Sequence, residues 1–251
     1  MKIEVALSGG GARCLAQLGY LDVLWRMGVE FTALAGSSGG SIAAAFLAQG
    51  MSPEEAFKEV LAFDFSTIRL NLFKGSIFTL EAVAKEFEKM GLRDFQALKV
   101  PLSVTLTRYE NGEVLYKKEG DLARSLIASS ALIPIFAPVE VEGEVYIDGG
   151  FGDNLPVRAL PGENFTVAIN VNPLNARFKP TFTGHFKKAC YILFNNNVKH
   201  SIPLADRFVQ IEEAGKFGIL DKKHLRVIYE IGKEQALRDQ KGWQELCSKN
   251  S

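Results

Sequence analysis

The sequence predicts an α/β fold in which a mostly parallel sheet is covered by helices on both faces. Apolar runs typical of buried strands alternate along the chain with segments of helical periodicity. The first two of these runs each pass through a glycine-rich turn into a helical pattern. The chain has 251 residues, enough for one large α/β domain, and no linker or repeat interrupts it. We therefore expect a single domain over residues 1–251.

The N-terminal part of the chain contains two strand, turn and helix units. The apolar segment 2–8 is the first expected strand, and the helix expected at 14–28 places leucines on one face. The segment 31–35 is the second expected strand. After its glycine turn, small side chains allow the helix expected at 41–50 to lie close against the sheet. Both strands therefore run through glycines into a helix.

The rest of the chain continues the alternation with less regular spacing. Ser52, Pro53 and Glu55 stand in the order of a capping box, and Asn111-Gly112 is a hairpin signal. The expected elements are helices at 52–63 and 79–91, a strand pair within 100–118, a short helix near 121–129, a small hairpin within 140–150, a strand at 164–171, a strand within 207–213 and a closing helix within 221–239. The segments 64–78 and 175–200 show no clear period.

Charge and composition exclude several classes of protein. Basic and acidic residues are equal at 29 each, and no basic run with interleaved aromatics is present, so no nucleic-acid partner is expected. The cysteines Cys14, Cys190 and Cys247 have no metal-site spacing, which favours a reducing compartment and predicts no metal. No apolar run approaches the roughly 20 residues of a membrane span, and the N-terminal segment turns glycine-rich too soon for a signal peptide. The expected location is therefore the cytoplasm.

The stretch AGSSGGS, residues 35–41, carries a hydroxyl where a side chain is hard to accommodate. Residues 36–40 match GxSxG with Ser38 at the centre. In a nucleophile elbow, small flanking residues allow a sharp strand-to-helix turn that projects the central hydroxyl out of the fold. The N-terminus of the following helix favours developing negative charge. The expected strand, turn and helix context predicts that Ser38 is a nucleophile.

A second glycine-rich turn, SGGGARC at residues 8–14, supplies flexible backbone amides that can converge on an oxyanion. The competing interpretation is a dinucleotide-binding turn. Cys14 stands where GxGxxG requires its third glycine, and no acidic residue ends the second strand. A nucleotide-binding module is therefore the less favoured alternative.

The base that a nucleophilic serine requires has two kinds of candidate. Three histidines follow Ser38, so chain order allows a Ser, Asp and His triad, but all three lie near lysines, as on a solvated face. They are His185, His200 and His224. Asp148 ends an expected strand and is followed by Gly149 and Gly150, so its carboxylate is expected near the carboxyl end of the sheet. The residues alone leave a dyad and a triad open.

Four segments resemble, in order, the motifs of the patatin-like phospholipase family. They are GGGAR, GSSGG, ASSALIPIFAPV and DGGFGDNLPV, within residues 1–157. The resemblance implies a three-layer α/β/α fold and a serine hydrolase that uses a Ser-Asp dyad without a histidine. Carried over by position, Ser38 would be the nucleophile and Asp148 its base. The implied oxyanion hole is the loop of Gly9, Gly10, Gly11 and Arg13, with the amides of Gly10 and Gly11 at its core. The implied elbow and motif glycines are Gly36, Gly39, Gly40, Gly149 and Gly150.

The substrate that this resemblance implies is a lipid or lysophospholipid ester, with no cofactor. An ordinary carboxylate is a weak base for a serine hydroxyl, so we expect apolar walls around Asp148. The apolar residues of 63–78 fit an acyl funnel, a membrane-contacting lid or buried core, and the sequence leaves these open. They include Phe63, Phe65, Leu70, Leu72, Phe73, Ile77 and Phe78. Cys14 replaces the family's usual glycine and is expected to pack against the sheet.

Overall fold

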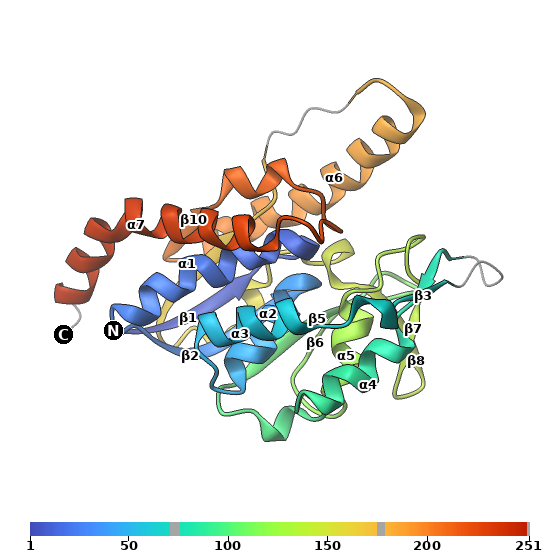
Figure 1. The fold of residues 1–251 in the computed structure, drawn as a ribbon, viewed down its shortest axis with the longest axis horizontal. Helices are drawn as coiled ribbons and strands as arrows, with labels where there is room; N and C mark the ends of the chain where they lie inside the picture. Colours follow the sequence, from blue (N-terminus) through green and yellow to red (C-terminus); the bar gives the residue numbers. More distant parts are fainter. Residues whose placement is uncertain (71–75, 175–178, 250–251) are drawn as a thin grey trace.

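The fold is built around one mixed sheet, shown in Figure 1 for a computed structural model that describes residues 1–70, 76–174 and 179–249. The strand order is β10-β9-β1-β2-β5-β8-β7, and β6 pairs with β5. The strands are β1 (Lys2–Leu7), β2 (Glu30–Ser37), β5 (Leu102–Arg108), β6 (Val114–Lys117), β7 (Val139–Val141), β8 (Glu144–Asp148), β9 (Phe165–Asn170) and β10 (Arg207–Gln210). The five strands from β10 to β5 are parallel, whereas β6, β7 and β8 pair antiparallel. The predicted mostly parallel sheet is therefore confirmed.

The helices follow the expected alternation closely, with one exception. They are α1 (Leu15–Arg26), α2 (Gly39–Ala48), α3 (Pro53–Ala62), α4 (Glu81–Lys89), α5 (Leu122–Ser129), α6 (Phe182–Ser201) and α7 (Leu225–Lys249). The sequence did not indicate α6, because its apolar residues form no single buried stripe: Phe182 and Leu193 are exposed while Val198 is buried. The short strands β3 (Arg69–Leu70) and β4 (Phe78–Thr79) form a separate pair in the aperiodic segment.

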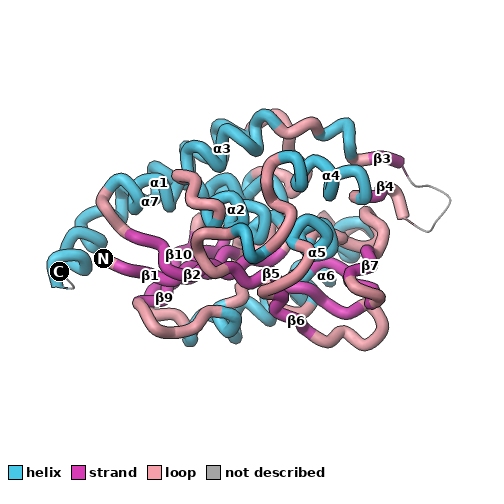
Figure 2. The backbone as a smooth tube through the Cα atoms, turned by 90° about the horizontal axis from the view of Figure 1, so that it is seen from below, coloured by secondary structure: helices cyan, strands magenta, loops and turns pink. Residues whose placement is uncertain are grey.

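Two apolar clusters lie on opposite faces of the sheet and make the fold three-layered. In β1, Val5 and Leu7 belong to the large cluster with α1 and α2, while Ala6 faces the smaller cluster. That smaller cluster includes Ala168 of β9 and Val198 of α6, so α6 packs against small strand residues. Figure 2 shows α1, α3 and α7 on the other side of the strands. None of the described helices combines the length and the apolarity that a bilayer-spanning segment requires.

Helices α1 and α7 run side by side and approach closely through two glycines (Figure 1). A Cβ atom at Gly19 would overlap the carbonyl of Tyr229, and one at Gly232 would overlap the carbonyl of Ala16. The same interface buries Trp243, whose indole N–H donates to the Tyr20 hydroxyl at 2.8 Å. The C-terminal helix is thereby fixed on α1, the helix that begins next to the first glycine-rich turn.

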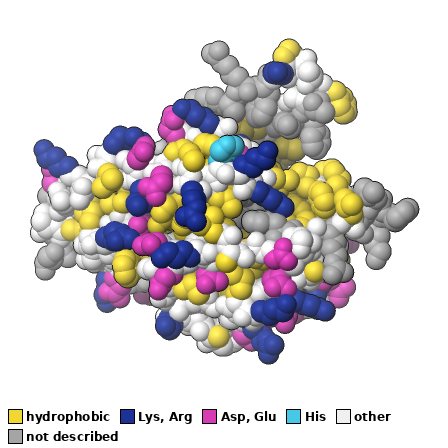
Figure 3. Space-filling view, viewed as in Figure 1, with side chains coloured by type: hydrophobic (Ala, Val, Ile, Leu, Met, Phe, Trp, Pro, Cys, Tyr) yellow, Lys and Arg dark blue, Asp and Glu magenta, His cyan; other side chains and the backbone are white. Residues whose placement is uncertain are grey.

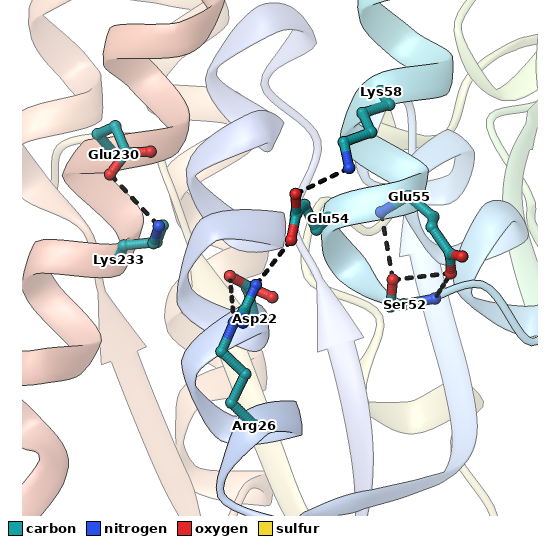
Figure 4. Close-up of polar contacts among 8 residues, drawn as sticks. All are labelled: Asp22, Arg26, Ser52, Glu54, Glu55, Lys58, Glu230 and Lys233. Carbon is teal, nitrogen blue, oxygen red and sulfur yellow. Dashed lines mark hydrogen bonds and ion pairs between the residues drawn. The ribbon is translucent and has the colours of Figure 1, made fainter.

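Helix α3 is attached to α1 by polar contacts at its N-terminus (Figure 4). The predicted capping box is confirmed: Ser52 Oγ accepts from the Glu55 N–H at 3.3 Å, and Glu55 Oε2 accepts from the Ser52 N–H at 2.8 Å. Arg26 of α1 bridges the buried carboxylate of Asp22 at 3.1 Å and Glu54 of α3 at 2.7 Å. The contact between Arg26 and Glu54 holds the N-terminus of α3 against α1.

We expect Gly232→Ala to lower the free energy of unfolding by about 1–3 kcal/mol, because the added methyl group must push α7 away from α1. Gly242→Ala is the matched control on the same helix, since a Cβ there meets only the Arg207 guanidinium, at 3.6 Å. That change should raise stability by about 0.5–1 kcal/mol through helix propensity. Urea unfolding of both variants measures the difference, and equal effects of the two substitutions would contradict the close-packed interface.

Candidate active site

Ser38 occupies a strained turn between β2 and α2. Its backbone has φ 51° and ψ −129°, a conformation that costs a non-glycine residue on the order of 1–3 kcal/mol. Two flanking glycines make room for this turn. A Cβ on Gly36 would lie 2.5 Å from Cα of Ser41, and a Cβ on Gly40 would overlap the carbonyl of Ser8. The small residues around Ser38 are therefore required by close backbone approach on both sides of the turn.

The Ser38 hydroxyl donates a hydrogen bond to Asp148 Oδ2 at 2.7 Å. The register of the sheet explains this contact. In β5, Thr105 pairs with Ser37 of β2, and the next residue, Leu106, pairs with Asp148 of β8. Asp148 therefore lies one residue beyond the level of Ser37, at the height of Ser38. It reaches the carboxyl end of β2 from an antiparallel strand.

Asp148 lies in a buried environment that changes its basicity. Its side chain is buried, and Oδ1 accepts from the Gly150 N–H at 2.8 Å. Burial raises the pKa of Asp148 from 3.8 to about 6, while the hydrogen bonds from Ser38 and Gly150 oppose the rise. A carboxylate with this pKa accepts a proton from a hydroxyl more readily than an ordinary aspartate does.

Ser129, at the end of α5, supports the elbow from a position 91 residues away in the chain. The Ser38 N–H donates to Ser129 Oγ at 2.9 Å, and Ser129 has no exposed surface. Sequence reasoning did not single out Ser129. The motif ASSALIPIFAPV contains it, but the prolines are the stronger local signal in that motif.

The first glycine-rich turn lies against the elbow. A Cβ on Gly9 would be 3.0 Å from Cβ of Ser38, and a Cβ on Gly39 would be 3.1 Å from Cα of Gly11. The Gly9 N–H donates to the Asn154 carbonyl at 3.1 Å and is therefore already used. Within the described residues, the N–H groups of Gly10 and Gly11 have no hydrogen-bond acceptor. These two amides are the ones that the turn leaves available for a ligand.

Arg13 holds this turn to neighbouring segments. Its Nε donates to the carbonyl of Phe217 at 2.7 Å, and its Nη1 donates to Asn172 Oδ1 at 3.2 Å. The Ala12 N–H donates to the carbonyl of Ile219 at 2.8 Å. The hydrogen bonds of the Arg13 side chain thus go to the segment before α7 and to the segment after β9, so its role within an oxyanion hole stays a prediction.

An apolar cavity of about 220 Å³ opens onto Ser38 and Asp148. Helices α1 to α5 contribute to its wall, with Phe46 of α2 and Phe87 of α4 among the largest side chains. On the outer surface, hydrophobic side chains gather on the right of the view in Figure 3, whereas acidic and basic ones mix elsewhere. The cavity has the composition that an extended hydrocarbon chain requires.

The segment predicted to form a funnel divides into two parts. Phe63 and Ile68 line the cavity, while Leu70 and Ile77 are exposed. Phe78 is half-buried and its ring lies 6.1 Å from that of Phe136, a cavity residue. Leu72, Phe73 and the side chain of Phe65 lie outside the described residues. The funnel interpretation thus agrees with the inner part of the segment, and contact with a membrane stays a prediction for the outer part.

Comparison with known proteins identifies the family. A model of the family described as patatin-like phospholipase matches residues 5–161. The chain belongs to this family. Its central sheet with helices on both faces also resembles the crystal structure of VipD from Legionella pneumophila, with a TM-score of 0.59 and 13% identity over 94% of this chain and 66% of VipD.

Curated relatives of this patatin-like chain match it over part of their length. An uncharacterised NTE family protein of Mycobacterium bovis is 28% identical over 68% of this chain and 49% of its own length. A lysophospholipase NTE1 of Scheffersomyces stipitis is 24% identical over 77% of this chain and 13% of its own. A probable lipid hydrolase of Invertebrate iridescent virus 6 is 26% identical over 61% of each. The chain thus spans about half the length of the mycobacterial relative.

The surroundings of this patatin-like site bear on the alternatives that the sequence leaves open. No histidine is among the described residues that line the cavity; His185 and His200 are exposed on α6, and His224 pairs with Asp221 at 2.9 Å. No cluster of three or more metal-binding side chains occurs in the parts of the chain that the structure describes. Membership of a hydrolase family also leaves the nucleotide-binding interpretation of the first turn unsupported.

Cys14 packs beside the elbow as a neutral thiol. It is 3% exposed, its Sγ donates to the Ser8 carbonyl at 3.4 Å, and a Cβ on Gly39 would lie 3.0 Å from that sulfur. Burial raises the pKa of the thiol well above its usual value. The side chain also forms part of the cavity wall, so it limits the space next to Gly39.

We expect Ser129→Ala to slow ester hydrolysis by about tenfold or more, because the Ser38 N–H loses its partner and the strained turn loses its support. Ser125→Ala is the matched control on α5: its buried hydroxyl donates to the Asp121 carbonyl within the helix. Steady-state rates are compared with thermal stability for both variants. An equal fall of kcat/KM in Ser129→Ala and Ser125→Ala would contradict a specific role of Ser129 in supporting the turn at Ser38.

We expect Asp148→Asn to raise the free energy of unfolding at pH 7 by up to about 3 kcal/mol, since a buried charge is removed. The folded-state pKa of about 6 exceeds the ordinary 3.8, so folded wild type retains a proton that the unfolded chain has lost. Wild-type stability should therefore fall, relative to the variant, as the pH rises from about 4 to about 6.

Urea unfolding of both proteins from pH 4 to pH 7 measures this difference. The side-chain amide introduced by Asp148→Asn is expected to retain an acceptor for the Gly150 N–H, so the comparison reports the charge rather than the loss of that bond. A difference in stability that does not change with pH would contradict the raised pKa.

Proposed function

We propose that the chain is a lipid acyl hydrolase in which Ser38 is the nucleophile and Asp148 its base. The observation that carries the proposal is the 2.7 Å hydrogen bond from Ser38 Oγ to Asp148 Oδ2, two residues that line an apolar cavity. A buried carboxylate with a raised pKa and a serine on a strained turn form a reactive pair. The buried carboxylate and the strained turn each lower the stability of the fold. Packing alone therefore does not explain why they are present.

The proposed reaction proceeds through an acyl-enzyme. Asp148 takes the proton of Ser38 as Oγ attacks the ester carbonyl, and the N–H groups of Gly10 and Gly11 stabilise the resulting oxyanion. The N-terminus of α2, which begins at Gly39, favours the same negative charge. Protonated Asp148 then gives its proton to the leaving alkoxide. A water molecule releases the fatty acid by the reverse proton transfers, which restores the free hydroxyl of Ser38.

The proposed substrate is a phospholipid or lysophospholipid whose acyl chain enters the cavity. Its wall is almost wholly apolar, which suits a hydrocarbon chain and not a sugar or peptide. The names of two relatives point the same way, since one is a lysophospholipase and another a probable lipid hydrolase. Transient contact with a membrane surface is part of the proposal, because Leu70 and Ile77 are exposed on the segment that continues the cavity wall.

The proposal predicts that Ser38→Ala and Asp148→Asn each reduce hydrolysis by at least about a thousandfold, since each removes a reacting group. The variant with alanine at positions 185, 200 and 224 should retain near wild-type turnover, because no histidine takes part. The measurement is release of p-nitrophenol from a short-chain ester and of fatty acid from a lysophospholipid.

The circular dichroism of each variant serves as the folding control for these assays. Full activity of Ser38→Ala would refute the nucleophile. Loss of activity in the histidine variant alone would refute the dyad in favour of a triad.

A further inference from the structure

The side chain of Asn172 lies between the first glycine-rich turn and Arg13. Asn172 follows β9, and its Nδ2 donates to the carbonyl of Gly9 at 2.6 Å. Its Oδ1 accepts from Arg13 Nη1 at 3.2 Å. These two neighbours fix the orientation of the amide, because a guanidinium can only donate and a carbonyl can only accept. The Asn172 N–H2 group therefore faces Gly9.

The contact with Gly9 fixes a second group in the same peptide unit. The C=O and N–H of a trans peptide point in opposite directions, so the tethered Gly9 carbonyl turns the Gly10 N–H away from Asn172. The Gly10 carbonyl accepts from the Arg13 N–H at 3.2 Å, which fixes the Gly11 N–H in the same way. Those are the two amides that have no acceptor within the described residues.

The peptides of this turn need an external hydrogen bond to fix their orientation, because glycine offers little steric resistance to backbone rotation. Three consecutive glycines, Gly9 to Gly11, offer little steric barrier to reorientation of the peptides between them. Gly10 has φ 162° and ψ 11°, and Gly11 has a positive φ of 57°. Without an external contact, the same loop can present a carbonyl oxygen where the mechanism requires an N–H.

Asn172 is itself anchored to the sheet. The Asn170 side chain donates to the carbonyl of Asn172 at 2.8 Å and to Gln210 Oε1 at 2.8 Å. The Gln210 side chain donates to the same Asn172 carbonyl at 3.0 Å. The ends of β9 and β10 thus hold the backbone of Asn172, and the side chain transmits that position to Gly9.

We propose that Asn172 is a positioning residue that orients the Gly10 N–H toward the oxyanion formed at Ser38. The assignment rests on the proposed function, since it requires an oxyanion next to Ser38. Asn172 does not touch the reacting atoms. It acts through Gly9, and Arg13 contributes by fixing the amide of Asn172 and the carbonyl of Gly10.

The decisive variant is Asn172→Asp. A carboxylate has the shape of the amide and retains its contact with Arg13, so the fold should be preserved. It cannot donate to Gly9, and its negative charge repels that carbonyl. We expect kcat to fall roughly ten- to a hundredfold, somewhat less than the loss of a whole oxyanion donor, with KM and the thermal midpoint nearly unchanged.

The matched control is Asn195→Ala. Asn195 is buried, and its Nδ2 donates to a carbonyl of the segment after β9, that of Pro173, at 3.2 Å. Within the part of the chain that the structure describes, Asn195 makes no hydrogen bond to the glycine-rich turn. This variant should lose thermal stability and retain kcat, which separates a general loosening of the segment from the specific loss at Gly9.

Inhibition by an alkyl trifluoromethyl ketone provides the readout that a purely structural role would not move. The ketone adds to a serine hydroxyl as a tetrahedral oxyanion, so its Ki should rise in Asn172→Asp by about the factor by which kcat/KM falls. Wild-type kcat in this variant, an unchanged Ki, or an equal loss of kcat in Asn195→Ala would each overturn the proposal. Ketone binding and hydrolysis that both survive Ser38→Ala would instead overturn the proposed function.

Discussion

The site depends on one constraint, the register in which the neighbouring strands β2, β5 and β8 pair. β5 lies between β2 and β8, and its consecutive residues Thr105 and Leu106 pair with Ser37 and Asp148. A shift of one residue in either pairing would move Asp148 away from Ser38 or turn its side chain to the other face of the sheet. The 2.7 Å contact is therefore a property of the sheet register, and the elbow adds the final turn that brings the hydroxyl to the carboxylate.

The two glycine-rich turns pack directly against each other. Gly40 in the elbow packs against the carbonyl of Ser8, and Gly39 lies against Gly11 and Cys14. The same turns are supported by distant side chains: Gln17 donates to the Ser8 carbonyl at 2.9 Å, and Asn172 donates to Gly9. A fold that leaves amides free for a ligand must bind the carbonyls of the same peptides elsewhere. The contact of Asn172 with the Gly9 carbonyl is of this kind, whereas Gln17 binds the peptide whose Gly9 N–H already donates to Asn154.

The sequence predicts those site residues that stand next to a recognisable local pattern in the chain. Ser38 and Asp148 could be predicted because glycines adjoin them, and glycine patterns are local. Ser129 and Asn172 could not, since each contacts a glycine-rich turn through a hydrogen bond to a residue 91 or 163 positions away. The polar Asn172, just after the apolar strand β9, was the available signal. The helix α6 was not predicted for another reason: its apolar residues form no single stripe, since Phe182 and Leu193 are exposed while Val198 is buried.

The apolar cavity links substrate choice to basicity. Phe136, Ile127 and Leu132 line the same cavity as Asp148, and burial is the main cause of its raised pKa. If an acyl chain occupies this space as proposed, it displaces water from the same walls and desolvates the carboxylate further. A long chain would then gain both binding energy and a stronger base, whereas a short ester would leave Asp148 partly hydrated. In the proposed dyad, where one carboxylate would both take and return the proton, chain length would appear in kcat as well as in KM.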